Sequence, residues 1–321
     1  MDICYIPTLF GLPEANSLTE LSTGHINKTF LADCGNKKYI MQSLNSSVFC
    51  SPQAVMQNIS RIEAALENVP DIAVPHFIAA GDKNYTVIEG RIWRIYSYIT
   101  ANSNVLADAA AAGRAFGTFI RVMEGHELDK TPAIEGFHDF DRYFSKLAAL
   151  NRTDRCTLAA LDRLRDTLGQ VFTGSLKKRV IHGDAKLDNI IISNTLTIID
   201  LDTAMYGYAA IDFGDLVRSV SRGKVIDTTA VSDITIGFAQ GLAGLLSADE
   251  VKSLYYGILW LTGELAMRYL ADSQREVKYF RGKSSSECLS RAEELLRQLD
   301  MFTAHSDEIR KIIYSNMEKT Y

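Results

Sequence analysis

The stretch that decides the fold is His182-Gly183-Asp184-Ala185-Lys186-Leu187-Asp188-Asn189, together with the residues that flank it. The triplet Arg179–Ile181 precedes it and has the β-branched, apolar character of a strand. Residues 189–200 follow it as two β-branched arms around the turn Ser193-Asn194, which predicts a β-hairpin. The pattern therefore predicts a loop that runs from a strand into a hairpin, with Asp200 at the hairpin's far end.

The rest of the chain divides into a strand-rich part and a helical part. Short alternating or β-branched runs occupy 28–32, 38–42, 85–88 and 93–99, and one helix is expected at about 52–67. After residue 100, apolar residues recur at helical spacing in 107–124, 140–150, 157–172, 213–221, 234–245, 248–270 and 286–302. We therefore predict the α+β class with two lobes: residues 1–99 form a small antiparallel sheet with one helix, and residues 100–321 form a larger, mainly helical lobe that carries the hairpin.

Composition limits the partners and the compartment. The net charge of -5 gives no reason to expect binding to nucleic acid or to an anionic membrane. Five cysteines lie far apart without a CxxC pair, which argues against a disulfide framework or a zinc site and favours a reducing compartment. No signal peptide is recognised at the start, and the apolar stretch 254–270 is interrupted by Glu264 and Arg268. We expect a cytoplasmic protein without a membrane span, a monomer or a weak homodimer.

The loop residues match what phosphoryl transfer requires: a carboxylate at the acceptor hydroxyl, metal ligands at the phosphates and a positive charge on the transferred group. The spacing His-x-Asp, four residues, then Asn assigns Asp184 as the base and Asn189 as a Mg²⁺ ligand. Lys186 is placed to neutralise the transferring phosphate, and Asp200 supplies the second metal ligand. The alternative without a function is an ordinary turn followed by a strand that ends in Asp200. It does not explain why strand, loop, hairpin and terminal Asp200 occur together.

A second motif resembles a kinase signature but lacks its context. Asp212-Phe213-Gly214 has the letters of the metal-binding triplet of protein kinases, yet no hairpin places Asp212 beside Asn189. It begins a predicted helix instead. We interpret Asp212 as a buried carboxylate that caps this helix or braces the backbone of the loop, and we leave the metal role with Asp200.

The nucleotide side departs from the usual kinase pattern. The strand position that normally carries a lysine holds Gln42, and the helix position that normally carries its glutamate partner holds Asn58. One hypothesis is a neutral Gln42–Asn58 hydrogen-bonded pair; the alternative is that Gln42 is one register off and faces solvent. The segment Tyr96-Ser97-Tyr98-Ile99 ends the sheet lobe and is the predicted hinge that contacts the adenine of ATP.

These residues resemble the aminoglycoside phosphotransferase and choline kinase superfamily over essentially the whole chain, and within it the N-acetylhexosamine 1-kinases. The similar stretches are 24–27, 39–42 with 44–45, 115–117, 198–203, 212–215 and 267–272. The resemblance implies a two-lobed, protein-kinase-like fold and an ATP- and Mg²⁺-dependent kinase that phosphorylates the anomeric hydroxyl of a small sugar. Gln42 also resembles this group. The family has a bulky aromatic residue where Ser219 falls here.

The resemblance further implies sugar contacts from His25, Asp184, Arg268 and Tyr279. Without it, His25 would be read as a surface loop histidine, and Arg268 could equally form a buried pair with Glu264, four residues earlier. Two rival functions remain. One is a kinase of the same superfamily for an aminoglycoside, choline, homoserine or methylthioribose; the other is a pseudokinase-type binding module, favoured by Gln42 and opposed by the intact Asp184, Asn189 and Asp200.

Overall fold

The computed structural model describes residues 3–21, 26–101, 108–221, 226–280 and 282–319. Contacts divide the chain into two compact units with interleaved ranges. The first comprises Met1–Leu106, Gly125–Glu135 and Ile191–Ala204, and the second comprises Ala107–Glu124, Gly136–Ile190 and Met205–Tyr321. The hairpin that follows the loop thus belongs by its contacts largely to the first unit. The domain boundary after residue 99 stays a prediction.

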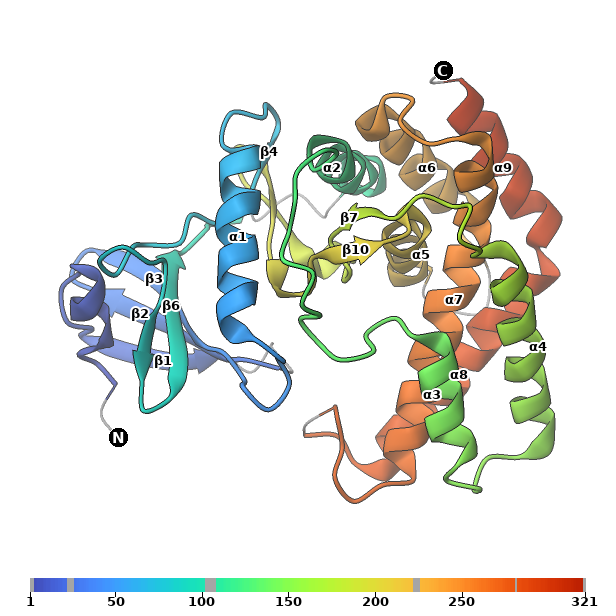
Figure 1. The fold of residues 1–321 in the computed structure, drawn as a ribbon, viewed down its shortest axis with the longest axis horizontal. Helices are drawn as coiled ribbons and strands as arrows, with labels where there is room; N and C mark the ends of the chain where they lie inside the picture. The colour runs from blue at the N-terminus through green and yellow to red at the C-terminus, as the bar shows by residue number, and fades with distance from the viewer. Residues whose placement is uncertain (1–2, 22–25, 102–107, 222–225, 281, 320–321) are drawn as a thin grey trace. The chain divides into compact units, whose positions relative to one another are not determined.

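The first unit is built on a five-stranded antiparallel sheet (Figure 1). Its strand order is β1-β2-β3-β6-β5; the strands span Ser17–Leu21, Lys28–Cys34, Lys37–Ser43, Arg91–Ser97 and Thr86–Ile88, given in the same order. A short 3-10 helix, η1 (Ile6–Phe10), adds Ile6 and Phe10 to a buried cluster with Met41, Trp93 and Ile95. Alternation along β3 and β6 places these apolar side chains on one face, which fixes the register of the sheet.

One helix and a second small sheet complete this unit. Helix α1 (Pro52–Leu66) begins at Ser51, whose side chain accepts a hydrogen bond from the backbone N–H of Ala54. Its buried residues recur at helical spacing, as the sequence predicts. Strand β9 (Leu196–Ile198) lies between β4 (Ile72–Ala73), which it pairs in parallel, and β8 (Ile190–Ile192). The predicted hairpin is therefore present, and it is part of a three-stranded sheet.

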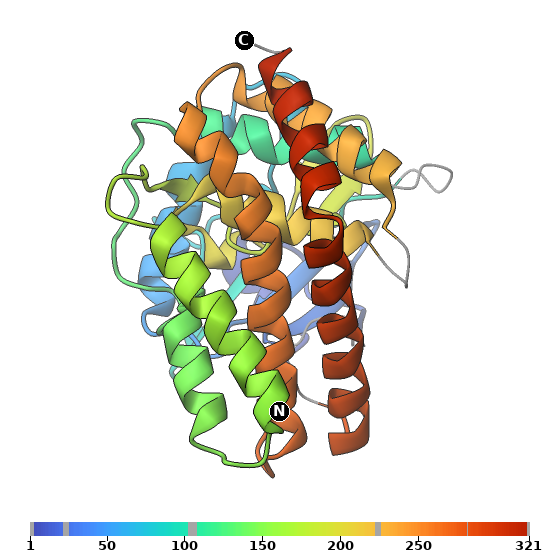
Figure 2. The ribbon, with the colours of Figure 1, turned by 90° about the vertical axis from the view of Figure 1, so that its right-hand side faces the viewer.

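The second unit consists of helices around a two-stranded ribbon of β7 (Arg179–Ile181) and β10 (Met205–Gly207). The helices are α2 (Ala109–Val122), α3 (Phe140–Ala148), α4 (Arg155–Val171), α5 (Ala209–Val220), α6 (Thr228–Leu242), α7 (Ala248–Ser273), α8 (Ser285–Ala304) and α9 (Ser306–Glu318). Helix α7 lies between α4 on one side and α8 and α9 on the other (Figure 2).

Glycines let the central helices approach closely. A Cβ built on Gly257 of α7 would lie 1.8 Å from the carbonyl oxygen of Ala210 in α5, and one on Gly214 would lie 2.2 Å from the backbone of Gly257. Only a residue without a Cβ allows such contact between two backbones. Helix α5, which carries Asp212, is thereby held firmly against α7, which carries Glu264 and Arg268.

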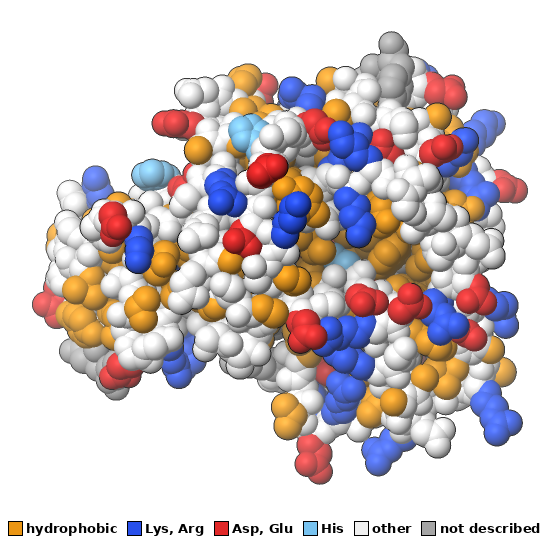
Figure 3. Space-filling model, viewed as in Figure 1, with side chains coloured by type: hydrophobic (Ala, Val, Ile, Leu, Met, Phe, Trp, Pro, Cys, Tyr) orange, Lys and Arg blue, Asp and Glu red, His pale blue; other side chains and the backbone are white. Residues whose placement is uncertain are grey.

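The helices predicted from periodicity are confirmed, with α5 beginning four residues and α6 six residues earlier than predicted. Strands β1, β4 and β10 and helix α9 were not predicted. None of the five cysteines, all within the described residues, forms a disulfide bond. Within the described ranges, no helix combines the length and the apolar content that crossing a bilayer requires. On the face shown in Figure 3, positive and negative side chains are interspersed.

Candidate active site

The strand that leads into the loop is anchored by a buried arginine. Arg179 of β7 donates from Nε to Glu250 Oε1 at 2.8 Å and from Nη1 to Glu124 Oε2 at 2.5 Å. Glu250 also accepts from the backbone N–H of Ser247 in the capping box of α7. Charge-assisted hydrogen bonds of this kind fix geometry well. The start of the loop is thus tied to α7 as well as to β10.

Asp212 braces the loop that follows β7. Its Oδ2 accepts the backbone N–H of His182 at 2.7 Å and its Oδ1 accepts that of Gly183 at 2.8 Å. Burial raises the pKa of this carboxyl above its usual value. The bracing interpretation is confirmed; the capping interpretation is wrong, because the N-cap of α5 is Tyr208 and Asp212 lies inside the helix.

Asp184, Lys186 and Asn189 come together around one carboxylate. Oδ2 of Asp184 accepts from Nζ of Lys186 at 2.6 Å and from Nδ2 of Asn189 at 2.8 Å. Nδ2 of Asn189 also donates to the backbone oxygen of Asp184 at 2.7 Å. Burial raises the pKa of Asp184, but the charge and the hydrogen bond of Lys186 outweigh it, so that the pKa lies below the usual value. Asp184 is therefore ionised at neutral pH.

The residues expected at the metal offer oxygen ligands. Both hydrogen bonds of the Asn189 amide use its nitrogen, which leaves the amide oxygen as the atom suited to a cation. Asp200 follows β9 in the left-handed conformation, with φ of 64°, at the start of the short helix η3 (Leu201–Thr203). A carboxylate and an amide oxygen fit Mg²⁺, which prefers a few oxygen ligands and keeps water or phosphate in its other positions.

Arg268 and Tyr279, two of the predicted acceptor residues, lie together. The Arg268 guanidinium carbon is 4.6 Å from the centre of the Tyr279 ring. Nη1 of Arg268 also lies 3.6 Å from Oε1 of Glu264, which is an ion pair without a hydrogen bond. Three further rings surround the guanidinium: Phe137, Tyr143 and Phe280. The expected pair of Arg268 with Glu264 is thus confirmed, and the sugar contact of Arg268 stays a prediction.

The Asp184 carboxylate acts electrostatically on this cluster. Burial raises the pKa of the Tyr279 hydroxyl, Arg268 opposes that rise, and Asp184 adds to it. The Arg268 side chain is 13% exposed. The fourth predicted contact, His25, lies outside the described residues. Ser219, at the position of the family's aromatic residue, is buried and accepts the backbone N–H of Leu187 at 3.4 Å.

On the nucleotide side, Gln42 and Asn58 do not form the proposed pair, and that hypothesis is wrong. Gln42 donates from Nε2 to Thr29 Oγ1 at 3.1 Å and accepts from Arg94 Nε at 2.9 Å. The Asn58 amide instead bonds both backbone groups of Asp129. The physical reason is that each amide has other partners. The buried guanidinium of Arg94, on the neighbouring strand, donates to the Gln42 amide oxygen. The Asn58 amide is occupied by hydrogen bonds with the backbone of Asp129.

Arg94 was not among the predicted site residues. Its guanidinium forms two bonds with Asp202, at 2.5 Å and 3.0 Å, and both side chains are only 2% exposed. Asp202 lies two residues after Asp200, and its Oδ2 also accepts from Asn27 at 2.7 Å. The sequence signal that could have identified Arg94 is its place within the apolar run Ile92–Ile95. A buried strand tolerates a charged side chain only when it is paired, so a buried acidic partner was to be expected.

The predicted hinge continues the sheet. Tyr96 packs edge-on against Phe77, and burial raises the pKa of its hydroxyl to about 12. Ser97 ends β6 opposite Tyr39, and the Tyr98 N–H donates to the carbonyl of Lys38 at 3.0 Å. The adenine contacts of Tyr96, Ser97, Tyr98 and Ile99 stay a prediction.

Comparison with solved structures places the fold. The chain is similar to a microcompartment-associated aminopropanol kinase, with 16% identity, a TM-score of 0.68, and coverage of 96% of this chain and 99% of the other. It is also similar to an amicoumacin kinase in complex with AMP-PNP and Ca²⁺, with 12% identity, a TM-score of 0.65, and coverage of 91% of this chain and 92% of the other. A third similar structure is spectinomycin phosphotransferase in complex with ADP and spectinomycin, with 17% identity, a TM-score of 0.58, and coverage of 98% of both chains.

These likenesses share the α+β architecture of a sheet-bearing N-terminal region and a helical C-terminal region. The sequence profile of the phosphotransferase enzyme family, APH, matches residues 17–243. That range includes the loop with Asp184, the hairpin and Asp212, and it covers more than half of the chain. The chain therefore belongs to the APH phosphotransferase enzyme family and is a small-molecule phosphotransferase.

Proposed function

We propose that this phosphotransferase uses ATP and Mg²⁺ to phosphorylate the anomeric hydroxyl of an N-acetylhexosamine. The observation that carries the proposal is the Asp184 carboxylate, which is held by Lys186 and Asn189 in the same unit as the Arg268–Tyr279 cluster. An ionised carboxylate can orient and deprotonate a hydroxyl, while a neighbouring arginine can bind the neutral oxygens of the acceptor.

In the proposed reaction, Asp184 accepts the hydroxyl proton as the acceptor attacks the γ-phosphate. An anomeric hydroxyl is more acidic than an ordinary alcohol, so a carboxylate with a lowered pKa suffices as the base. Lys186, 2.6 Å from Asp184, can shift to the transferring phosphoryl group and neutralise its charge. Asn189 and Asp200 would hold Mg²⁺, which neutralises the phosphate oxygens when bound.

The charge beside Asp184 separates the candidate acceptors. Arg268 keeps its positive charge because burial, which lowers its pKa, is outweighed by Tyr279, Tyr143 and Glu264. A fixed cation at this place disfavours the polycationic aminoglycosides and the quaternary amine of choline. It favours an acceptor with carbonyl or hydroxyl oxygens, such as the N-acetyl group of an amino sugar.

An acceptor screen tests this function. ADP release is measured with N-acetylglucosamine, N-acetylgalactosamine, hexoses, choline, homoserine, methylthioribose and an aminoglycoside, and ³¹P NMR identifies the product. We expect turnover with an N-acetylhexosamine and a sugar 1-phosphate as the product. Turnover confined to an amine-bearing acceptor would refute the sugar assignment, and ATP binding without turnover of any acceptor would favour the binding-module alternative.

Matched variants connect the activity to Asp184. In Asp184→Asn, kcat should fall by roughly 10² or more, the usual scale of losing a general base, while ATP binding persists. Asp188→Asn is the control, because this carboxylate is exposed on the same loop. A variant Asp184→Asn that keeps most of its turnover would contradict the assigned base.

A further inference from the structure

A buried histidine, His138, lies against the loop that carries Asp184. It precedes the N-cap of α3, and its side chain is 7% exposed. Its ring nitrogens contact two different elements: Nε2 lies 2.7 Å from the carbonyl oxygen of Gly183, and Nδ1 lies 3.1 Å from Oε2 of Glu264 in α7. The residue has a left-handed backbone, with φ of 56°. Such a conformation is unfavourable for a residue with a Cβ and is retained where other contacts impose it.

The two contacts determine the protonation of the ring. A carbonyl oxygen can only accept a hydrogen bond, and so can a carboxylate oxygen. Neutral imidazole has one N–H, which would leave one of these two buried contacts without a proton. Imidazolium has two N–H groups and satisfies both. Beside an ionised Glu264, both contacts therefore carry a proton only when His138 is positively charged.

The charges around His138 support this state. Burial lowers the pKa of His138, but Glu264 and, more weakly, Asp215 of α5 raise it above the usual value. Burial raises the pKa of Glu264, but His138 and Arg268 lower it below the usual value. Trp260 also donates to Oε2 of Glu264 at 3.3 Å. The Phe137 ring lies 4.0 Å from the imidazole, centre to centre.

Gly183 is thus held on both of its backbone groups. Its N–H donates to Asp212 of α5, and its carbonyl accepts from His138. Gly183 itself has φ of 78° and is followed directly by Asp184. Because the orientation of the Gly183 carbonyl sets the peptide that links it to Asp184, a change at His138 reaches the Asp184 backbone without intervening contacts.

We propose that His138, as an imidazolium, is a positioning residue for phosphoryl transfer: it fixes the Gly183 carbonyl and hence Asp184, and it shares Glu264 with the acceptor-side cation Arg268. The inference rests on the proposed role of Asp184. It adds an ionised triad, His138–Glu264–Arg268, that joins the base-bearing loop to the acceptor cluster. Asp184 is then correctly placed only while His138 carries its second proton.

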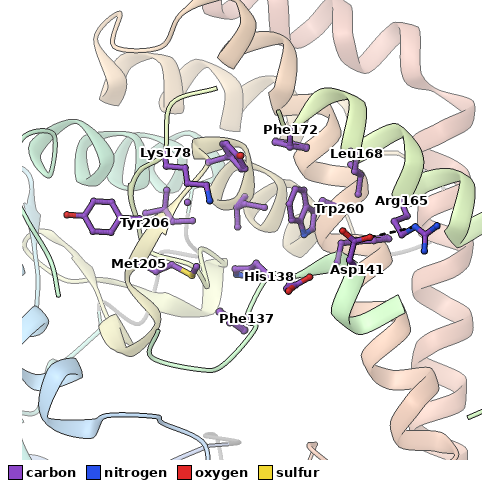
Figure 4. Close-up of a pocket in the computed structure, with 17 residues that line it drawn as sticks. Phe137, His138, Asp141, Arg165, Leu168, Phe172, Lys178, Met205, Tyr206 and Trp260 are labelled. Atoms are coloured by element: carbon purple, nitrogen blue, oxygen red, sulfur yellow. Dashed lines mark ion pairs between the residues drawn. The ribbon is translucent and has the colours of Figure 1, made fainter. Parts of the chain in front are cut away.

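A cavity gives access to the ring for a test. A hollow of about 390 Å³ is lined by Phe137, His138, Phe140, Phe172 and Trp260, among others (Figure 4). Glycine is well suited to the left-handed backbone at position 138, so His138→Gly removes the ring and relieves backbone strain at once. Imidazole added to the solution can then enter the vacated space from the cavity.

In His138→Gly we expect kcat to fall by about 10- to 100-fold, the scale of a catalytic group misplaced by about 1 Å, with the KM for ATP nearly unchanged. Imidazole should restore part of kcat, and the restored fraction should be larger below the usual histidine pKa of about 6.5 than two units above it. His126→Gly, which removes an exposed loop histidine, should leave kcat and its pH profile unchanged.

Two results would overturn the inference: a kcat in His138→Gly equal to that of the unmodified protein, or a loss of kcat whose pH profile keeps the same alkaline limb. A second variant, Glu264→Gln, covers the case of poor imidazole entry. Without the carboxylate, His138 should lose its second proton more readily, so the alkaline limb of kcat should move to lower pH. An unmoved limb would count against the proposal.

A measurement without turnover separates this inference from the proposed function. In the ¹⁵N- and ¹³C-labelled protein, the His138 ring should titrate above the usual histidine pKa, and the Gly183 amide shift should follow the same curve. If no acceptor is turned over, the proposed function fails, and this titration still decides the arrangement of His138. A neutral His138 ring at pH 7 would overturn it.

Discussion

Arg94 lies directly opposite Gln42 in the β3–β6 register and donates from its Nε to the Gln42 amide oxygen at 2.9 Å. The cation that is missing from the usual strand position is therefore present on the neighbouring strand. It is turned toward Asp202, two residues after the proposed metal ligand Asp200. Gln42 contributes as the neutral partner that orients the guanidinium, and the negative charge comes from η3 instead of α1.

Removing Arg94 should destabilise the first unit strongly. Arg94→Met leaves Asp202 buried without its cation, and breaking such a pair from one side costs about 3–5 kcal/mol. Tm, measured by calorimetry, should fall on the order of 10 °C. The double variant Arg94→Met/Asp202→Leu should recover part of the loss, because it buries no lone charge. Arg91→Met, exposed on the same strand, is the control. Equal Tm values for the single and double variants would contradict the pair's role.

Lys186 should determine both kcat and the acid limb of the pH profile of kcat/KM. Lys186→Met removes the charge that lowers the pKa of Asp184, so this pKa should rise and the acid limb of kcat/KM should move to higher pH. The loss of a cation at the transferring phosphate should also lower kcat by about 10²–10³-fold. Stopped-time assays across pH would measure both effects, with Lys178→Met as an exposed control. A slower enzyme with an unmoved acid limb would show that Lys186 does not control Asp184.

The sequence predicted the residues that act within one local segment and missed those that act across the fold. Asp184, Lys186 and Asn189 lie within six residues, so their spacing alone placed them in one loop. For Asp212, the absence of a hairpin argued against a metal role but left capping and bracing open, and the hydrogen bonds to His182 and Gly183 decide for bracing. Arg94 and His138 were missed because their partners lie 108 and 126 residues away, and spacing carries no information about such contacts.

The same distinction holds for secondary structure. Helix α7 was predicted because apolar residues recur along it, and its capping box at Ser247 and Glu250 marks its start. Strand β10 was missed because Met205–Gly207 contains no β-branched residue, unlike the equally short β7, and it forms by pairing with β7. Tertiary pairing decides such short strands, and local preference does not.

The contact between α5 and α7 should not tolerate a side chain at Gly257. In Gly257→Ala, the new methyl group would lie against the Ala210 carbonyl, so the helices must separate, at a cost of about 1–3 kcal/mol from overpacking. Gly169→Ala in α4 is the matched control, because open space surrounds it and alanine favours a helix by about 1 kcal/mol. Urea unfolding should show opposite signs for the two variants. A Gly257→Ala protein as stable as the unmodified one would contradict the close approach.

The charged pair of His138 and Glu264 should make stability depend on pH in two ways. The pKa of His138 is raised by folding, so its contribution is complete below about pH 6.5 and is lost as pH rises through the folded value. The pKa of Glu264 is lowered, so its contribution is complete above about pH 4.3 and is lost as pH falls through the folded value. The difference in Tm between the unmodified protein and His138→Phe should therefore shrink at alkaline pH. A constant difference would contradict the ionised pair.

Arg268 should act on the acceptor and not on the nucleotide. Arg268→Lys keeps the charge but loses the planar guanidinium that faces Tyr279 and presents several donors in one plane. A charged hydrogen bond contributes about 1.5–3 kcal/mol, so the KM for the acceptor should rise by about 10- to 100-fold. The KM for ATP should change little. Arg297→Lys, at an exposed position of α8, is the control for the substitution itself.

Tyr279→Phe refines this prediction, because it keeps the ring under the guanidinium and removes only the hydroxyl. If the Tyr279 hydroxyl contacts the acceptor, the KM for the acceptor should rise in Tyr279→Phe too, by a smaller factor than in Arg268→Lys. If the ring alone matters, Tyr279→Phe should behave like the unmodified protein while Tyr279→Ala does not. An equal rise of both KM values in Arg268→Lys would mean that Arg268 supports the fold around Glu264, and the acceptor site would then have to be sought elsewhere.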